Sequence, residues 1–362
     1  MSVRPLTEYC TLNMGQSPDS KTYNTQGNGL PFYQGNADFG ETHPITRVWC
    51  SAPVKVAEEG DILISVRAPI GAMNMAVERC CIGRGLAALT PIRNKCSKQF
   101  LYYALQSKVD SLIAQGTGST FKAISKKVLE ATCIPAYSTI EQEQIAETIG
   151  HVDNTIAAKR KQLALLDQVV KSRFIELFGD PLSNDKGWKK VVIAEVCHAI
   201  FGGGTPSKSH PEYFAGSIPW VSPKDMKSSV INDSIDHITE EAIAHSTTNL
   251  VPANSVLMVI RSGILKHSLP VAINSLPVTI NQDMKAFVPN ETVKTAFLMH
   301  FFKAIENDVL AGVRGVTADN IDFKAFQKRT IIVPPLALQE QFAAFVEQTD
   351  KSKLCSKMEV AA

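Results

Sequence analysis

The sequence predicts an α+β protein made of two copies of one globular unit, each followed by a long helix. Three observations predict this class. Short β-branched apolar runs recur along the chain, the same series of motifs occurs twice, and a proline-free helical stretch separates the two series. A chain of 362 residues is long for one domain and comfortable for two, and 44% apolar with 20% charged residues is an ordinary globular composition.

Evidence for duplication comes from ordered matches between two parts of the chain. "GDILISVRAPI" at 60–70 aligns with "NSVLMVIRSGI" at 254–264, and "LPFYQGNADF" at 30–39 aligns with "IPWVSPKDMK" at 218–227. "IPAYSTIEQEQIA" at 134–146 then aligns with "VPPLALQEQFA". Because the order is kept and the offset stays near 197 residues, drifting only from 188 to 199, we interpret the chain as two copies of one unit.

Each copy is expected to combine short strands with a helical segment. "DILISVRA" and "SVLMVIR" are typical of strands, whereas 98–115 and 295–311 each predict one continuous helix. Ile-Pro or Val-Pro then ends each globular part. We therefore expect globular domains over 1–137 and 179–337.

A long central helix is predicted over 138–178. Ser138 or Thr139 can cap its start, with Glu141 or Gln142 as the capping-box partner, and glycine followed by proline ends it at "FGDP". At 1.5 Å per residue, such a helix is roughly 60 Å long. We interpret it as a spacer between the two globular domains.

Apolar residues along this helix alternate steps of three and four, which predicts a coiled-coil seam interrupted by Lys159 and Arg173. A second, shorter helix over 338–362 could pair with part of it as an antiparallel coiled coil. The rest of the seam must then face another protein chain, or the sequence is a shortened version of a longer protein. The predicted seam residues are Ile145, Ile149, Val152, Ile156, Leu163, Leu166, Val170, Leu177, Leu338, Phe342 and Phe345.

Bulk properties restrict the class of protein. A net charge of +2 neither demands nor excludes a polyanionic partner. The eight cysteines form no CxxC pair and fit neither a zinc site nor a disulfide framework, which favours reduced thiols in a cytosolic protein. The N-terminus lacks a signal-peptide core, and no apolar run reaches the roughly 18 residues that a membrane span needs. We expect a cytoplasmic protein.

Motifs for catalysis are missing from the sequence. "FGGGTPSKS" at 201–209 lacks the Gly-Lys-Ser/Thr order of a phosphate loop, and "IVPPL" at 332–336 lacks the polar and aromatic residues of an amino-methyltransferase motif. The eight histidines show no metal-binding pairing. We therefore expect no catalytic residue, no metal site and no cofactor in this chain.

Three longer stretches resemble a known family. "GDILISVRAPIG" with "IGRGLAAL", the central helix with its "FGDP" end, and "GGGTPSKSHPEYFAGSIPWVSPKDM" are similar to the specificity (S) subunit of type I restriction–modification enzymes. "IIVPPLALQEQFAAFVEQTD" resembles the family's second conserved helix, so the resemblance covers essentially the whole chain. It implies two target-recognition domains that each read one half of a bipartite double-stranded DNA sequence.

The resemblance also implies a multi-subunit complex. The long helices would dock two modification subunits, which carry S-adenosylmethionine and methylate adenine, and restriction subunits with ATP and Mg would join the full complex. The distal helix is shorter than is usual in the family. One chain could dock two modification subunits, or shortened copies could pair.

DNA contacts are expected from polar and basic loop residues, because Lys and Arg bind phosphates and polar side chains read base edges. Each Ser, Thr or Asn could instead cap a turn, and Arg67 and Arg261 could form structural ion pairs. Tyr33 and Trp220 are expected to pack in the domain cores. The candidates are Ser17, Lys21, Gln34, Asn36, Arg67, Arg84, Thr117, Ser119, Thr120, Lys122, Ser207, Lys208, Ser222, Lys224, Arg261, Lys266, Gln282, Arg314 and Thr317.

Three functions compete on this evidence. The first is a non-catalytic DNA-recognition subunit, which the resemblance favours. The second is a methyltransferase or nuclease fused to recognition domains, against which the missing cofactor motifs count. The third is a duplicated scaffold that binds only proteins through its coiled coil.

Overall fold

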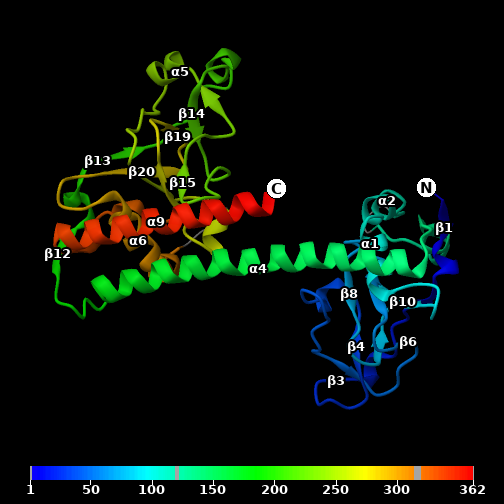
Figure 1. Cartoon of the computed structure of the whole chain (residues 1–362). Coiled ribbons are helices and arrows are strands. Elements are labelled where there is room, and N and C mark those ends of the chain that lie inside the picture. The colour runs from blue at the N-terminus through cyan, green and yellow to red at the C-terminus, as the bar shows by residue number, and fades with distance from the viewer. Residues whose placement is uncertain (1, 119–121, 314–318, 362) are drawn as a thin grey trace. The chain divides into compact units, whose positions relative to one another are not determined.

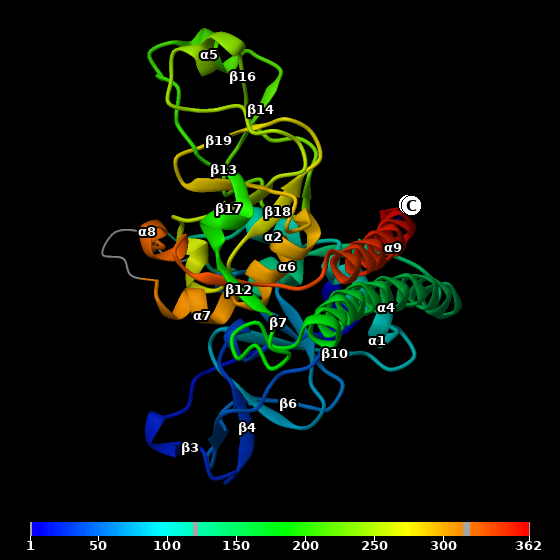
Figure 2. The same cartoon turned by 90° about the vertical axis from the view of Figure 1, so that its left-hand side faces the viewer.

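The computed structural model describes residues 2–118, 122–313 and 319–361 and divides into two compact units, Met1–Ala157 and Ala158–Ala362 (Figures 1 and 2). The boundary falls inside one long helix, so each unit contains its own part of that helix. In the part of the chain that is described, no helix is both long and apolar enough to cross a membrane.

Two sheets form the scaffold of the first unit. Its strands are β1 (Val3–Pro5), β2 (Cys10–Met14), β3 (Tyr23–Asn24), β4 (Leu30–Tyr33), β5 (Trp49–Cys50), β6 (Val56–Ala57), β7 (Ile62–Ser65), β8 (Met73–Met75), β9 (Cys80–Ile82), β10 (Leu86–Pro91) and β11 (Cys133–Pro135). The main sheet is antiparallel in the order β2-β10-β7-β8. The second sheet has the order β3-β5-β4-β9-β6, and β4 and β9 in it are parallel. Strands β1 and β11 pair separately and bring the two ends of the globular part together.

Three helices complete the globular part of this unit: α1 (Lys98–Gln106), α2 (Val109–Ala114) and α3 (Lys126–Ala131). The prediction of one continuous helix over 98–115 is wrong, because the chain breaks after α1, where the Ser107 hydroxyl donates to the Ala104 carbonyl. Helix α1 buries Phe100 and Leu105 in one core with Ile64 of β7. This packing fixes the main sheet, and the ends of its strands carry the loops considered below.

The second unit repeats this scaffold. Its strands are β12 (Lys189–Val192), β13 (Cys197–Gly202), β14 (Ile218–Val221), β15 (Val230–Ile231), β16 (His237–Ile238), β17 (Val256–Val259), β18 (Val271–Asn274), β19 (Thr279–Ile280), β20 (Met284–Pro289) and β21 (Thr330–Val333). The main sheet has the order β13-β20-β17-β18-β15, and a smaller sheet has the order β16-β14-β19. Strands β14 and β19 are parallel, as β4 and β9 are in the first unit, and β12 pairs with β21 as β1 does with β11.

Helices α5 (Glu240–Ala244), α6 (Thr295–Ala304), α7 (Glu306–Ala311) and α8 (Phe323–Phe326) belong to the second unit. The predicted single helix over 295–311 is also wrong, since buried Ile305 (φ −97°, ψ 10°) separates α6 from α7. Helix α6 buries Phe297, Phe301 and Phe302 in a core that includes Phe287 of β20. Because strand order, parallel pair and helix break all recur, the structure supports the predicted duplication, and the α+β prediction is confirmed to this extent.

Two long helices follow the globular parts in sequence. Helix α4 spans Thr139–Phe178, close to the predicted bounds, and α9 spans Leu336–Ala361. At its start, the Ser138 backbone N–H and hydroxyl both donate to the Glu141 carboxylate at 2.8 Å, so the capping-box partner is Glu141. Within the second unit α4 and α9 lie side by side in opposite chain directions (Figures 1 and 2): Phe174 contacts Phe342, and Asp167 contacts Lys353.

Candidate nucleic-acid interface

Four of the predicted DNA-contacting residues line one pocket of about 430 Å³ in the first unit: Gln34, Asn36, Arg67 and Arg84. They come together because three strand ends meet at one edge. Gln34 follows β4 and Arg84 follows β9, which run parallel, while Arg67 follows β7, whose last residue Ser65 lies opposite the first residue of β10. The duplicated strand of the sequence analysis therefore ends at a polar surface.

Backbone hydrogen bonds hold these loops in place and add two more predicted residues. The Gly85 N–H donates to the Gln34 carbonyl at 3.1 Å, and the Ala68 N–H donates to the Lys122 carbonyl at 3.1 Å. The Ser17 hydroxyl accepts from the Arg84 N–H at 3.3 Å. Because backbone rather than side-chain groups make most of these bonds, the side chains of Gln34, Arg84 and Lys122 stay exposed.

Charge in this pocket is predominantly positive. Arg67 and Arg84 are exposed, and within the described ranges neither guanidinium has a carboxylate within 4.0 Å. The one acid in the pocket, Asp38, accepts a hydrogen bond from the Gln34 N–H at 2.7 Å. The pocket therefore offers two guanidinium groups and two side-chain amides, which are the donors best suited to base edges and phosphates.

The equivalent position in the second unit is occupied differently. Arg261 follows β17 as Arg67 follows β7, but its Nε lies 2.6 Å from the Asp283 carboxylate. Asp283 stands where the first unit has Gly85. Of the two alternatives predicted for these arginines, the structural ion pair is therefore present at Arg261 and is not seen at Arg67.

Other predicted residues of the second unit lie around this ion pair or in turns. The Thr205 hydroxyl donates to the side chain of Gln282, and Lys266 lies 3.9 Å from Asp319. Ser222 is buried and donates to Asp225 at 2.9 Å, as the turn-capping alternative predicts. Ser207, Lys208 and Lys224 occupy exposed loop positions. In the first unit, Thr117 is also exposed, and the Lys21 N–H donates to the Asp19 carboxylate at the start of a turn. Ser119, Thr120, Arg314 and Thr317 lie outside the described residues.

Close backbone approach explains two glycines that the sequence analysis did not single out. A Cβ at Gly15 would lie 2.1 Å from the Gly83 carbonyl, and one at Gly203 would lie 1.7 Å from the Asn281 carbonyl. Both glycines begin the loop that leaves the first strand of a main sheet. A glycine directly after the second strand of each copy was the signal available in the sequence.

Two buried glutamines anchor the long helices: Gln142, which was considered only as a capping-box partner, and Gln339, which was not singled out. Gln142 is fully buried, accepts from the Ser97 N–H at 2.9 Å and donates to the Lys95 and Tyr137 carbonyls. Gln339 makes the matching bonds with Lys294 N–H and two carbonyls at the start of α9. Both are the first residue of the repeated "QEQ" at 142–144 and 339–341, so the duplicated motif could have indicated them.

The predicted helix seam is only partly buried. Val170 and Phe342 are buried, and Leu177, Leu338 and Phe345 pack against the core of the second unit, whereas Ile149 and Val152 are 36% and 54% exposed. Ile145 packs against the core of the first unit, and Ile156, Leu163 and Leu166 are half-buried. The most buried face of α4 includes Phe174 and Phe178, which the predicted register omitted in favour of Leu177.

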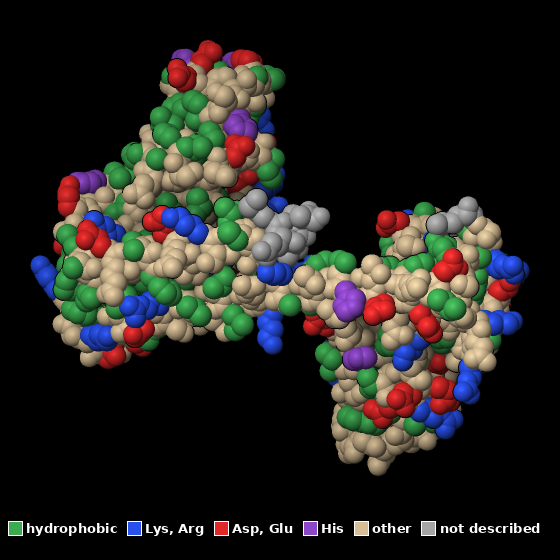
Figure 3. Space-filling view, viewed as in Figure 1, with side chains coloured by type: hydrophobic (Ala, Val, Ile, Leu, Met, Phe, Trp, Pro, Cys, Tyr) green, Lys and Arg blue, Asp and Glu red, His purple; other side chains and the backbone are tan. Residues whose placement is uncertain are grey.

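Acidic and basic side chains are interspersed on the visible face of each unit (Figure 3). No single basic patch dominates that face, so its charge pattern alone does not mark a DNA-binding surface. Trp220 is half-buried and donates to the Gly204 carbonyl, and Tyr33 is 1% exposed, so both pack in the protein as expected.

A duplicated α+β scaffold, with polar loops gathered at strand ends and a long helix after each globular part, defines a modular recognition protein. The family model of the type I restriction modification DNA specificity domain matches residues 1–168 and 185–358. The chain therefore belongs to this family and contains two copies of its domain.

Individual relatives agree with this assignment. The type I restriction enzyme EcoR124I/EcoR124II specificity subunit of Escherichia coli is 41% identical over 153 residues, 41% of this chain. The MjaIX specificity subunit of Methanocaldococcus jannaschii is 23% identical over 92% of this chain and 83% of its own length. A crystal structure of a type I restriction–modification S subunit from M. genitalium has a TM-score of 0.61 at 15% identity, covering 99% of this chain and 92% of that one, which supports the fold.

The alignments with two of the curated relatives are partial. They span 38% of the E. coli subunit and 39% of another M. jannaschii relative that is 41% identical. Activities and partners of the complete relatives are therefore carried to this chain only as proposals.

Proposed function

We propose that this chain is the non-catalytic DNA-recognition subunit of a type I restriction–modification complex and that it acts in the cytoplasm. The observation that carries the proposal is the duplicated unit, which the family model matches twice. Two copies of one recognition unit in a single chain are suited to a target sequence in two halves. Each unit would read one half-site of double-stranded DNA.

The chain would be organised in four segments. Residues 1–137 and 179–337 form the target-recognition domains, residues 138–178 form the central spacer helix, and residues 338–362 form the distal helix. Contacts of Phe174 with Phe342 and of Asp167 with Lys353 support an antiparallel coiled coil between the two helices. The exposed apolar residues Ile149 and Val152 would be available to a partner chain.

Modification subunits, two in the complete complex, would dock on these helices and supply S-adenosylmethionine and the methyl-transfer site. Restriction subunits would bring ATP and Mg. The present chain would contribute sequence choice alone, since adenine methylation is assigned to the docked subunits.

In the first unit, Arg67, Arg84 and Gln34 would read base edges, and Lys122 would neutralise a phosphate. An arginine can bind guanine O6 and N7 with two hydrogen bonds, and a glutamine can do the same with adenine. Ser17, Asn36, Thr117 and Lys21 would support or extend this surface. In the second unit the corresponding set is Gln282, Lys266, Lys208, Lys224, Ser207, Ser222 and, held by Asp283, Arg261.

Methylome sequencing tests the proposal directly. Cells that carry this chain with its modification subunits should contain methylated adenine in a bipartite motif with a constant spacer. The matched control is the same cells with the modification subunits alone, in which the motif should be absent. An identical methylome in both cells, with all subunits expressed, would refute the proposal. The affinity for the cognate duplex should also fall by roughly 0.9 log units per log unit of salt for each phosphate neutralised.

A further inference from the structure

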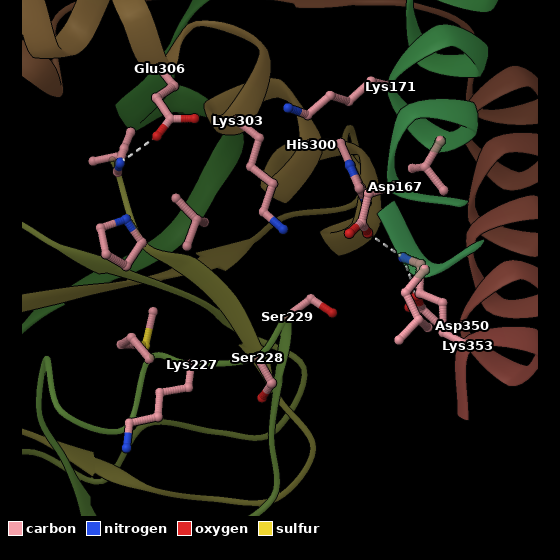
Figure 4. A pocket seen from close by; sticks show the side chains of 16 residues that line it. Asp167, Lys171, Lys227, Ser228, Ser229, His300, Lys303, Glu306, Asp350 and Lys353 are labelled. Atoms are coloured by element: carbon pink, nitrogen blue, oxygen red, sulfur yellow. Dashed lines mark hydrogen bonds and ion pairs between the residues drawn. The ribbon is translucent and has the colours of Figure 1, made fainter. Parts of the chain in front are cut away.

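A second pocket of about 430 Å³ lies wholly within the second unit (Figure 4). Helices α4, α6 and α9 form its walls, and residues 226–229, Glu306 of α7 and residues 269–271 close the remainder. Its polar lining combines lysines with three carboxylates. Which of these groups are already paired decides what the pocket can bind.

The carboxylates of this pocket have partners in the protein. Lys353 donates to Asp167 at 2.8 Å and to Asp350 at 3.0 Å, and these contacts raise its pKa against the opposing effect of burial. Glu306 accepts a hydrogen bond from the Leu269 N–H at 2.5 Å. The three acids are therefore engaged by an ammonium group or by the backbone, which leaves less of their charge to repel a bound anion.

Two groups on α6 lack such partners among the described residues. The side chain of Lys303 extends into the pocket (Figure 4), and no carboxylate lies within 4.0 Å of its ammonium group in the described ranges. Burial lowers the pKa of Lys303. His300, one turn earlier, has a buried Nε2 atom with no hydrogen-bond partner. A desolvated cation and a buried unpaired imidazole nitrogen both favour a polar ligand.

We propose that this pocket binds the phosphate group of a small molecule, from inorganic phosphate up to a nucleotide in size. Lys303 and Lys171 supply ammonium groups to this space from α6 and α4, whereas the ammonium group of Lys227 points away from Lys303 (Figure 4). The hydroxyl of Ser229 lies on the opposite lining. Lysine binds phosphate as a point charge, and ligand pockets of about 300–1,000 Å³ hold molecules of nucleotide size.

A DNA backbone carries the same chemistry but fits the geometry less well. A duplex presents its phosphates on a wide convex surface, whereas Lys303 is half-buried among helices and loops on several sides. The site is separate from the residues proposed to read DNA, so binding of small phosphates does not depend on that function.

Binding is measured by isothermal titration calorimetry on the full chain in complex with its modification subunits. The probes are inorganic phosphate, pyrophosphate and metal-free ATP. We expect at least one probe to bind and Lys303→Met to weaken that binding by about tenfold to a hundredfold, as loss of a charge-assisted contact predicts. Lys189→Gln is the matched control, because Lys189 is an exposed lysine on β12 outside the pocket. It should leave affinity unchanged.

Two further measurements keep the outcome decisive. The variant Lys171→Gln changes only an exposed lysine, so it should fold normally and should also weaken binding if Lys303→Met does not fold. Absence of binding by every probe, or equal binding by the pocket variants and the control, overturns the proposal. It is also overturned if Lys303→Met lowers affinity for the cognate duplex while leaving small phosphates unaffected, since the site would then be a DNA-backbone contact.

Discussion

Replacement of Arg67 by alanine tests whether the unpaired arginine of the first unit reads DNA. The guanidinium is exposed and has no carboxylate within 4.0 Å among the described residues, so its removal breaks no ion pair of the folded chain. A specific arginine–base contact is worth about 1–3 kcal/mol, which corresponds to a roughly five- to 150-fold higher Kd. The free energy of unfolding should change by only about 0.5 kcal/mol, as for an ordinary surface position.

Fluorescence anisotropy with a labelled duplex containing the methylated motif measures this loss, on the chain in complex with its modification subunits. Arg79→Ala is the matched control, because Arg79 is also an exposed arginine of the same unit, pairs with Glu58 at 3.3 Å and lies outside the pocket. The reasoning is refuted if both variants bind within twofold of the parent. If Arg67→Ala lowers both the affinity for DNA and the free energy of unfolding, Arg67 has a supporting role in the fold instead.

Three further predictions concern stability. Phe174→Ala should lower the free energy of unfolding by about 3–5 kcal/mol, because Phe174 is 2% exposed and contacts three other phenylalanine rings. The control Leu165→Ala, on the exposed face of α4, should lower it by about 0.5 kcal/mol or less. Equal losses for the two variants in urea unfolding would contradict this packing. Gln142→Leu should cost about 2–5 kcal/mol because it removes the glutamine partner of three backbone groups, and an unchanged urea midpoint would show that these hydrogen bonds contribute nothing. Burial, followed by repulsion from nearby lysines, lowers the pKa of His300 to about 3, so below pH 6.5 the unfolded chain takes up a proton at this residue while the folded chain does not. The free energy of unfolding should therefore fall toward pH 5 by at most about 1.4 kcal/mol per pH unit. His300→Leu should flatten this fall, and parallel pH profiles of the variant and the parent would refute the prediction.

The duplication could be predicted from the sequence because strand patterns, prolines and the start of the long helix repeat in one order. Local signals also placed α4 to within a residue of its start, since caps and a glycine stop act through the backbone nearby. Helix breaks were missed at Ser107 and Ile305. Both residues are compatible with a helix, and the break depends on how each pair of helices packs over its sheet.

The sequence indicated which polar and basic loop residues could contact DNA, but it did not indicate which of them lie together in space. Gln34, Arg67 and Arg84 are distant in sequence, and they share a pocket only because a parallel strand pair and an antiparallel neighbour end at one edge. The pairing of Arg261 with Asp283 was not visible for the same reason. The register of the α4 seam was missed because Phe174 and Phe178 pack on α6 and α9, which a single-helix pattern cannot include.

The two units use one scaffold with different constraints at the arginine. In the first unit, a Cβ at Gly85 would lie 2.3 Å from the Gln34 carbonyl, so no carboxylate can stand there to pair with Arg67. In the second unit, the carbonyl of Ser222, which aligns with Gln34, instead accepts the Asp225 N–H at 3.0 Å in a turn. Space beside the sheet edge then admits Asp283, which holds Arg261. The residue at this aligned position, glycine or aspartate, thus distinguishes the arginine that has a carboxylate partner from the one that has none among the described residues, and under the proposed function the two half-sites would be read by different chemistry.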